Sequence, residues 1–205
     1  SIGVKDIKTL EGIEAIRLRP GMYIGSTGPE GVKHITLEII SNAIDEYLMG
    51  YCTSCSVYIG EDDDITIIDN RRGIPFGKAE DGSETLENIF TKLHTGAKFD
   101  STGETGYNTS GGMNGVGAKA TNALSGFFVV DTHRDGKEAI IIFKKGEKQG
   151  DIIIREWKDK GYPSGTRIAF MPDEEIFKEG ITLDYNELKH KWEKIIKKLD
   201  SFLDL

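Results

Sequence analysis

The sequence predicts an α+β fold, with helices on one face of a mixed, mostly antiparallel sheet. Helical hydrophobic patterns dominate the first half of the chain, and alternating, β-rich segments dominate the second half. Such partial segregation of helices and strands is typical of this class. Hydrophobic residues make up 38% of the 205 residues, enough for one substantial core. We therefore expect a single domain over residues 1–205.

The first half of the chain is expected to open with two helices. The first is a short amphipathic helix over Ile7–Arg19, ended by Pro20-Gly21. The second covers Pro29–Met49, and its predicted apolar face comprises Leu37, Ile40, Ile44 and Leu48. The segments that follow are strands Cys55–Ile59 and Ile65–Asp69, helix Thr85–Leu93, a glycine-rich loop over 96–117 and helix Ala118–Leu124.

The second half is expected to form strands and a closing helix. Turns are expected at Asp135-Gly136 and Lys145-Gly146. A lysine-rich amphipathic pattern predicts a final helix over Tyr185–Leu203. The predicted strands are Phe127–His133, Ala139–Lys144, Ile152–Trp157 and Thr166–Met171.

Charge and composition exclude several classes of protein. The net charge of −8 argues against a general nucleic-acid-binding surface, which is normally basic. No apolar run approaches the length of a membrane span, and no signal-peptide pattern opens the chain, so we expect a cytoplasmic domain. Cys52 and Cys55 lack the second ligand pair of a structural zinc site, and strand-like residues follow them. We expect both cysteines to be buried and inert.

The strongest candidate site is a polar stripe on the second helix. Steps of three and four residues place its members on one face, and no Lys or Arg offsets the acids between Lys33 and Leu48. A Glu with a His one turn earlier could activate water, and an Asn amide oxygen could ligate Mg²⁺. The alternative is a solvated helix face, the commonest origin of such a stripe. Its members are His34, Glu38, Asn42, Asp45 and Glu46.

Two further segments suit nucleotide chemistry. Asp69 ends a strand and precedes a glycine turn, so its carboxylate could accept a hydrogen bond from a base, although a plain turn explains the pattern equally well. The glycines of 111–117 precede a helix, so backbone amides and the helix dipole could bind phosphates. The spacing matches neither a dinucleotide fold nor a P-loop, and the segment could simply be flexible. Lys98 and Lys119 flank it.

These segments, in this order, resemble the ATPase domain of type IIA DNA topoisomerases, the B subunit of gyrase or of topoisomerase IV. The resemblance covers essentially the whole chain. It rests on Gly12–Gly25, Glu38–Glu46, Leu93–Asp100, Gly111–Ser125, Arg134-Asp135-Gly136, Gly165-Thr166 and Lys198–Leu203. It implies the Bergerat (GHKL) sandwich, with helices over a mixed sheet of about eight strands.

The resemblance also implies roles for individual residues. Glu38 would be the general base for the water that attacks the γ-phosphate, oriented by His34, and Asn42 would hold Mg²⁺. Asp69 would accept a hydrogen bond from the adenine amino group, and Thr166 would assist through a bridging water. Arg134 would lie at the pocket mouth, where the family's aminocoumarin inhibitors bind. The other residues assigned to the nucleotide pocket are Glu46, Arg72, Gly73, Ile74, Pro75, Lys98, Tyr107, Gly112, Asn114, Gly115, Val116, Gly117 and Lys119.

Several positions depart from the family pattern. Arg71 stands where the pattern Asp-Asp-Gly-Arg-Gly-Ile-Pro has its first glycine, which should restrict the turn and add charge at the pocket mouth. Asn114 and Ala118-Lys119 look more like the eukaryotic loop, and Ser41 replaces a common Asp. A viral or otherwise divergent source, such as a phage, would fit these departures.

The resemblance sets expectations for activity and partners. In the family a transducer domain supplies a lysine to the γ-phosphate, so this segment alone should bind ATP but hydrolyse it weakly. The full enzyme would work as a homodimer with an A-type subunit and DNA, whereas the segment should be monomeric. The competing hypotheses are a histidine-kinase catalytic domain, an ATP-operated dimer clamp of the mismatch-repair or chaperone type and, least favoured, a direct DNA-binding module.

Overall fold

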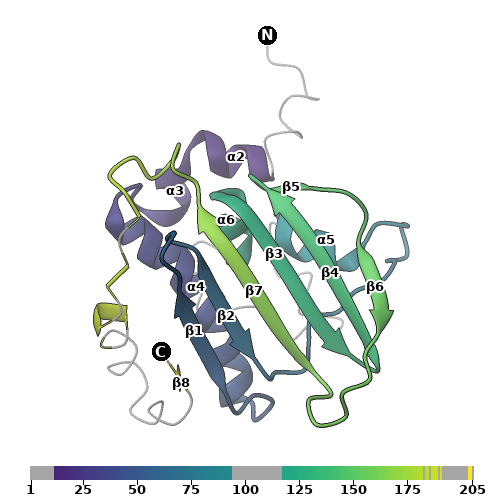
Figure 1. Ribbon diagram of the computed structural model, residues 1–205. Coiled ribbons are helices and arrows are strands. Elements are labelled where there is room, and N and C mark those ends of the chain that lie inside the picture. Colours follow the sequence, from purple (N-terminus) through teal and green to yellow (C-terminus); the bar gives the residue numbers. More distant parts are fainter. Residues whose placement is uncertain are drawn as a thin grey trace.

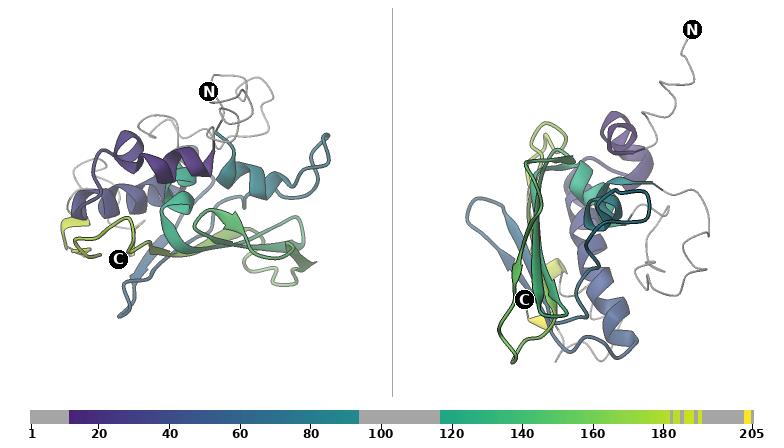
Figure 2. Two further views of the ribbon diagram at one scale, coloured as in Figure 1. Left: turned by 90° about the horizontal axis from the view of Figure 1, so that it is seen from above. Right: turned by 90° about the vertical axis from the view of Figure 1, so that its right-hand side faces the viewer.

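One face of a twisted sheet is covered by helices, and the other face is open (Figure 1, Figure 2). The computed structural model describes residues 12–93, 117–181, 183–184, 186–188, 190 and 203–204. The predicted α+β class is confirmed, and the sheet has eight strands within these ranges. Among the described residues, no helix has the length and apolarity to cross a membrane.

The sheet is mixed, as predicted, because a single strand pair is parallel among those described. Its order is β5-β4-β3-β7-β2-β1-β8, with β6 also paired to β4. All pairs are antiparallel except β1 with β8, where Cys55 lies opposite Leu203. The strands are β1 (Cys55–Ile59), β2 (Ile65–Asp69), β3 (Ser125–Arg134), β4 (Lys137–Lys144), β5 (Glu147–Lys148), β6 (Ile153–Glu156), β7 (Gly165–Pro172) and β8 (Leu203–Asp204).

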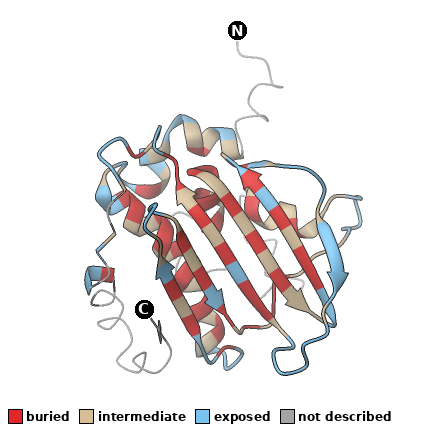
Figure 3. Ribbon diagram, viewed as in Figure 1, coloured by how far each residue is buried: buried red, intermediate tan, exposed pale blue. Residues whose placement is uncertain are grey.

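The helices named below all lie on the same side of the sheet, as the right-hand view of Figure 2 shows with the sheet edge-on. They are α2 (Ile13–Leu18), α3 (Pro20–Ile24), α4 (Pro29–Leu48), α5 (Thr85–Thr91) and α6 (Ala118–Ala123). The core between the layers includes tilted contacts of Phe128 with Phe90, Phe143 and Phe170, with ring centroids 5.4, 6.3 and 6.0 Å apart. Burial alternates along the central strands, so each has one face in this core (Figure 3).

Most predicted boundaries agree with the structure to within one or two residues, and both predicted hairpin turns are present. Asp135 and Gly136, like Lys145 and Gly146, all have positive φ. Turns with two left-handed residues match the twist of antiparallel strands, which explains their use here.

The predicted end of the first helix is confirmed, whereas the predicted end of the last helix is wrong. Helix α2 ends before Pro20, with Arg19 as its C-cap, but Pro20 also begins α3, because a proline at the first helical position loses no hydrogen bond. Leu203 does not end a helix: it lies in β8, paired with β1. Residues 7–11 and most of the predicted last helix lie outside the described residues, although residues 186–188 and 190 are helical.

The apolar face predicted for α4 is only partly right. Ile40 and Ile44 are buried and Leu37 is half-buried, but Leu48 is 65% exposed at the end of the helix. Val32, Ile35 and Ile39 also face the core. The buried arc is therefore wider than one stripe, because both the sheet and α6 pack against this helix.

Candidate nucleotide-binding site

The polar stripe of α4 is not a solvated helix face. Glu38 is 6% exposed and Glu46 is 1% exposed, while Asn42 and Asp45 are half-buried. Removing carboxylates from water is costly unless their environment compensates for it. This burial excludes a solvated helix face as the explanation of the stripe.

His34 and Glu38 are paired one helical turn apart. The distance from His34 Nε2 to Glu38 Oε1 is 3.2 Å, as the i, i+4 spacing favours. The other oxygen, Glu38 Oε2, is buried and has no hydrogen-bond partner among the described residues. Asn42 Oδ1 is in the same state one turn further along. Asp45 Oδ2 is a third such atom on this helix. The helix therefore presents three buried acceptors without a hydrogen-bond partner among the described residues, and such groups suit a water proton and a hard cation.

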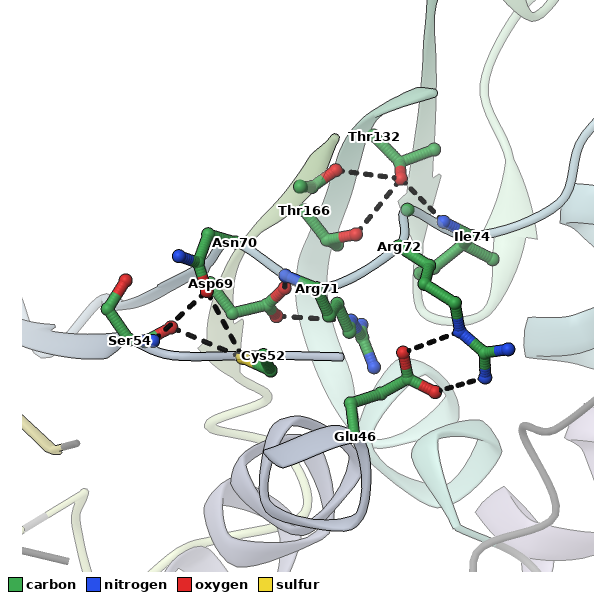
Figure 4. A network of polar contacts seen from close by, with 12 residues as sticks. Glu46, Cys52, Ser54, Asp69, Asn70, Arg71, Arg72, Ile74, Thr132 and Thr166 are labelled. Carbon is green, nitrogen blue, oxygen red and sulfur yellow. Dashed lines mark hydrogen bonds and ion pairs between the residues drawn. The ribbon is translucent and has the colours of Figure 1, made fainter. Parts of the chain in front are cut away.

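Glu46 is held by Arg72, which follows β2 (Figure 4). Arg72 Nε and Nη2 donate to the two carboxylate oxygens at 2.9 and 2.6 Å. The guanidinium also lies over the Tyr51 ring, 3.9 Å from its centroid. This two-point contact ties the C-terminal half of α4 to the turn after β2.

Asp69 ends β2 and is 7% exposed. Its Oδ1 accepts a hydrogen bond from the Arg71 backbone amide at 3.1 Å, and its Oδ2 lies 3.1 Å from Arg71 Nε. Burial raises the pKa of Asp69 to about 6, against the opposing effect of Arg71. Asp69 is therefore mostly ionised near neutral pH and loses its charge just below it.

The expectation for Arg71 is wrong. Its side chain is 1% exposed, so it adds its charge inside the protein and not at the pocket mouth. Its φ is not positive, so the turn needs no glycine at this position. The next polar residue back, Asn70, braces the same turn: its Oδ1 accepts from the amides of Thr53 and Ser54 at 2.9 and 3.0 Å.

Thr166 belongs to a hydroxyl network that sequence reasoning found only in part. Its Oγ1 lies 2.9 Å from that of Thr132, which also accepts from the Ile74 amide at 2.8 Å. The strand register explains this, because Thr166 lies opposite both Asp69 and Thr132. Thr132 was missed because a lone threonine within a strand carries no sequence signal of function.

Close backbone contacts require glycine at two positions near Asp69. Gly73 has φ of +80°, and a Cβ there would lie 2.5 Å from the His133 carbonyl oxygen. At Gly165 a Cβ would lie 2.7 Å from the Asp69 carbonyl oxygen. Arg134, on the neighbouring strand end, donates to the Gly73 carbonyl at 3.5 Å. Ile74 is buried and Pro75 is half-buried in the same turn.

The α6 end of the site is described only in part. Gly117 caps α6 with φ of +53°, and Lys119 is half-buried, so burial lowers the pKa of its ammonium group. Thr121 links α6 to the Ile35 carbonyl of α4 at 2.7 Å. The remaining predicted site residues lie outside the described part of the chain: Lys98, Tyr107, Gly112, Asn114, Gly115 and Val116.

The cysteines and metal-ligating groups add no second site. Cys52 and Cys55 are buried and free, and burial raises the pKa of Cys52 to about 11, so it stays a thiol. Within the described ranges, no cluster of three or more His, Cys, Asp or Glu residues could hold a metal ion.

The family model described as "Histidine kinase-, DNA gyrase B-, and HSP90-like ATPase" matches residues 27–175. The chain belongs to this family. The match includes all the described site residues, from α4 to β7. The expected ATPase fold is confirmed, and ATP is the nucleotide that this family uses.

Within the ATPase family, the chain is similar to the B subunits of type IIA topoisomerases. It is 43% identical to the DNA gyrase B subunit of Synechocystis over 194 residues, 94% of this chain and 18% of that protein. It is 44% identical to the DNA topoisomerase 4 B subunit of Staphylococcus aureus over 185 residues, 90% of this chain and 27% of that protein. The chain therefore spans about a fifth to a quarter of the length of these relatives.

Solved structures give the same result. The 43K ATPase domain of Thermus thermophilus gyrase B, in complex with an aminocoumarin, aligns with a TM-score of 0.78 and 36% identity, covering 96% of this chain and 49% of that one. The topoisomerase IV ATP-binding domain of Francisella tularensis, in complex with a small-molecule inhibitor, aligns with a TM-score of 0.73 and 33% identity, covering 89% and 46%.

Proposed function

We propose that this chain is the ATP-binding domain of the B-type polypeptide of a type IIA topoisomerase, and that it binds and hydrolyses ATP to drive DNA strand passage. The observation that carries the proposal is the buried polar stripe of α4, with three buried acceptors that lack partners among the described residues. The similarity to gyrase B and topoisomerase 4 B supports the choice of this class over a histidine kinase or a dimer clamp.

Glu38 acts as the general base in this proposal. His34 contacts Oε1, which leaves Oε2 to take the proton of the water that attacks the γ-phosphate. The contact with His34 at 3.2 Å orients the carboxylate, and burial limits competing water. Positioning of this kind supplies much of the catalysis in phosphoryl transfer.

Asn42 would hold Mg²⁺ together with phosphate oxygens. Its Oδ1 is buried without a partner among the described residues, and amide oxygens suit this cation. When bound, Mg²⁺ neutralises part of the phosphate charge. Asn42 is neutral, so it adds no repulsion toward that charge.

The turn after β2 binds the base in this proposal. Asp69 accepts a hydrogen bond from the adenine amino group, and Thr166 acts through a bridging water. Gly73, Ile74 and Pro75 shape this end of the pocket, Arg134 lies at its mouth, and the Arg72–Glu46 pair holds it against α4. The phosphates would contact Lys119, the amides near Gly117 and the remaining predicted residues of 98–116.

The partners follow from the proposed class. We propose that the complete protein works as a homodimer with an A-type subunit and DNA in the cytoplasm, as a bacterial or phage enzyme, and that this segment alone is monomeric. Aminocoumarin binding is proposed by analogy with the gyrase B complex.

Calorimetric titration with a non-hydrolysable ATP analogue and Mg²⁺ tests the pocket. Asp69→Asn should weaken binding by roughly 10- to 100-fold, because the charged acceptor is replaced by a neutral amide. Asp62→Asn, in the exposed β1–β2 turn, is the matched control and should bind like the wild type. Equal affinity of Asp69→Asn and wild type would refute the role of Asp69 in binding the base.

A further inference from the structure

Arg71 is a fully buried cation placed beside the base-binding carboxylate. It stands two residues after Asp69 and is 1% exposed. Figure 4 shows its side chain running past the Asp69 carboxylate toward α4, on the side that carries Glu46. A buried guanidinium is costly to desolvate, so a purely structural filler at this position would more readily be apolar.

Arg71 contacts Asp69 through both its backbone and its side chain. The amide donates to Oδ1 at 3.1 Å, and Nε lies 3.1 Å from Oδ2. The two contacts engage different oxygens of one carboxylate, so they fix its rotation as well as its position. Each oxygen retains a further lone pair for another donor.

The other charged and titratable groups around Asp69 do not favour its ionised form. Glu46 approaches from α4 and raises the pKa of Asp69. Cys55, opposite Asp69 on β1, and Cys52 before that strand are neutral thiols, because burial raises the pKa of both. On β7, Asp69 lies opposite the neutral Thr166. Arg71 is therefore the group near Asp69 that stabilises its charge.

We propose that Arg71 is a positioning residue for base recognition, which keeps the Asp69 carboxylate ionised and oriented toward the adenine amino group. The inference rests on the proposed role of Asp69 in binding the base. It explains how this chain uses an arginine where the family pattern has a glycine: the pocket presents an acceptor whose charge is supported from within the protein.

The first test needs no nucleotide. Carbon-13 NMR titration of the Asp69 carboxyl, assigned with Asp69→Asn, is compared in wild type, Arg71→Met and Arg71→Lys. The wild type should titrate at about 6. Arg71→Met should move this midpoint upward by about one to two units, because an adjacent opposite charge is lost. Arg71→Lys should keep the Asp69 midpoint close to the wild-type value, since the ammonium keeps the positive charge.

The second test measures binding of a non-hydrolysable ATP analogue with Mg²⁺ between pH 5.5 and 9. At pH 7, Arg71→Met should bind roughly 2- to 10-fold more weakly than wild type and should recover by pH 9, as the shifted ionisation of Asp69 requires. Arg167→Met, an exposed arginine on the open side of β7, is the matched control and should keep the wild-type profile. Arg71→Gln replaces Arg71→Met if circular dichroism shows that the latter does not fold.

The outcomes separate this inference from the function on which it rests. An unchanged Asp69 midpoint in Arg71→Met, or a binding profile identical to wild type, would overturn the role of Arg71 while leaving Asp69 in the pocket. Binding that is insensitive to Asp69→Asn at every pH, or absent in the wild type, would overturn both roles, even if the NMR titration still detects the ion pair.

Discussion

The two ends of the candidate site differ in how their polar groups are satisfied. At the end formed by the turn after β2 and the neighbouring strands β3 and β7, several polar side chains already have hydrogen-bond or ion-pair partners within the protein: Asp69, Asn70, Arg72, Thr132 and Thr166. On α4, Glu38 Oε2, Asn42 Oδ1 and Asp45 Oδ2 are buried without hydrogen-bond partners among the described residues. One end is a preformed scaffold, whereas the other has acceptors available for a ligand. Binding affinity should depend on the first end and turnover on the second.

The sharpest test of this contrast is Glu38→Gln. We expect hydrolysis to fall by roughly 10²–10⁴-fold, because the general base is lost, while affinity for an ATP analogue changes less than about threefold. Phosphate release should be measured in a gyrase B-length chain, where turnover is faster, and affinity by calorimetry. Glu30→Gln, exposed in the first turn of α4, is the control. Full turnover in Glu38→Gln would show that the base is another residue.

At the preformed end, Gly73→Ala should have the largest effect on stability. The new Cβ would meet the His133 carbonyl oxygen at 2.5 Å, in addition to the strain of a φ of +80°. We expect a loss of about 3 kcal/mol. Gly82→Ala shares the strain, with φ of +83°, but has open space around it, so it should lose only about 1 kcal/mol. Urea denaturation of both variants measures the difference; equal losses would mean that the contact relaxes freely.

Removing the ion pair that links the two ends of the site should destabilise the protein somewhat less than Gly73→Ala. Arg72→Ala leaves the buried Glu46 carboxylate without its two-point partner, and we expect a loss of about 2 kcal/mol, reduced because Arg72 itself is partly exposed. The control is Arg155→Ala, which breaks the more exposed pair with Glu138 and should cost below about 1 kcal/mol. Thermal unfolding of both variants gives the comparison. Equal losses would argue that the Glu46 pair does not couple the ends.

The smallest expected effect lies away from the site, on the open face of the sheet. Burial and the neighbouring Glu138 raise the pKa of Asp131 to about 6. The folded protein therefore binds this proton more tightly than the unfolded chain, and ionising Asp131 costs stability as the pH rises through about 4 to 6. Asp131→Asn should stabilise by about 1 kcal/mol at pH 8 and by less at pH 5. Asp62→Asn is the exposed control, and a pH-independent gain in melting temperature would refute the assignment.

Local pattern predicted much of this fold. The bounds of β1 and β2 were predicted to the residue, and α4 to within one residue, because their periodicity and flanking turns are local signals. The pairing of β8 with β1 was not predictable, since it joins segments nearly 150 residues apart. The helix end before Pro20 was predicted but the start of α3 at Pro20 was not, because proline both ends helices and begins them.

The site shows a similar division. The stripe on α4 follows from helical spacing, and its burial supports the interpretation, but its catalytic role stays a prediction. Arg71, which replaces a glycine of the family pattern, was expected to add charge at the pocket mouth; only the folded structure shows that its side chain is buried beside the Asp69 carboxylate. Thr132 acquires its partners through strand register, which the sequence does not display.

Helix α4 has one more consequence, because a single rigid element joins the two ends. Glu46, which Arg72 ties to the turn after β2, and Glu38 lie eight residues apart on it, or about 12 Å along its axis. In the proposed function, this spacing sets the distance between the base and the reacting phosphate. A nucleotide with a shorter phosphate chain would then bind at the base end without reaching Glu38, so the helix would distinguish nucleotides by the length of their phosphate chains.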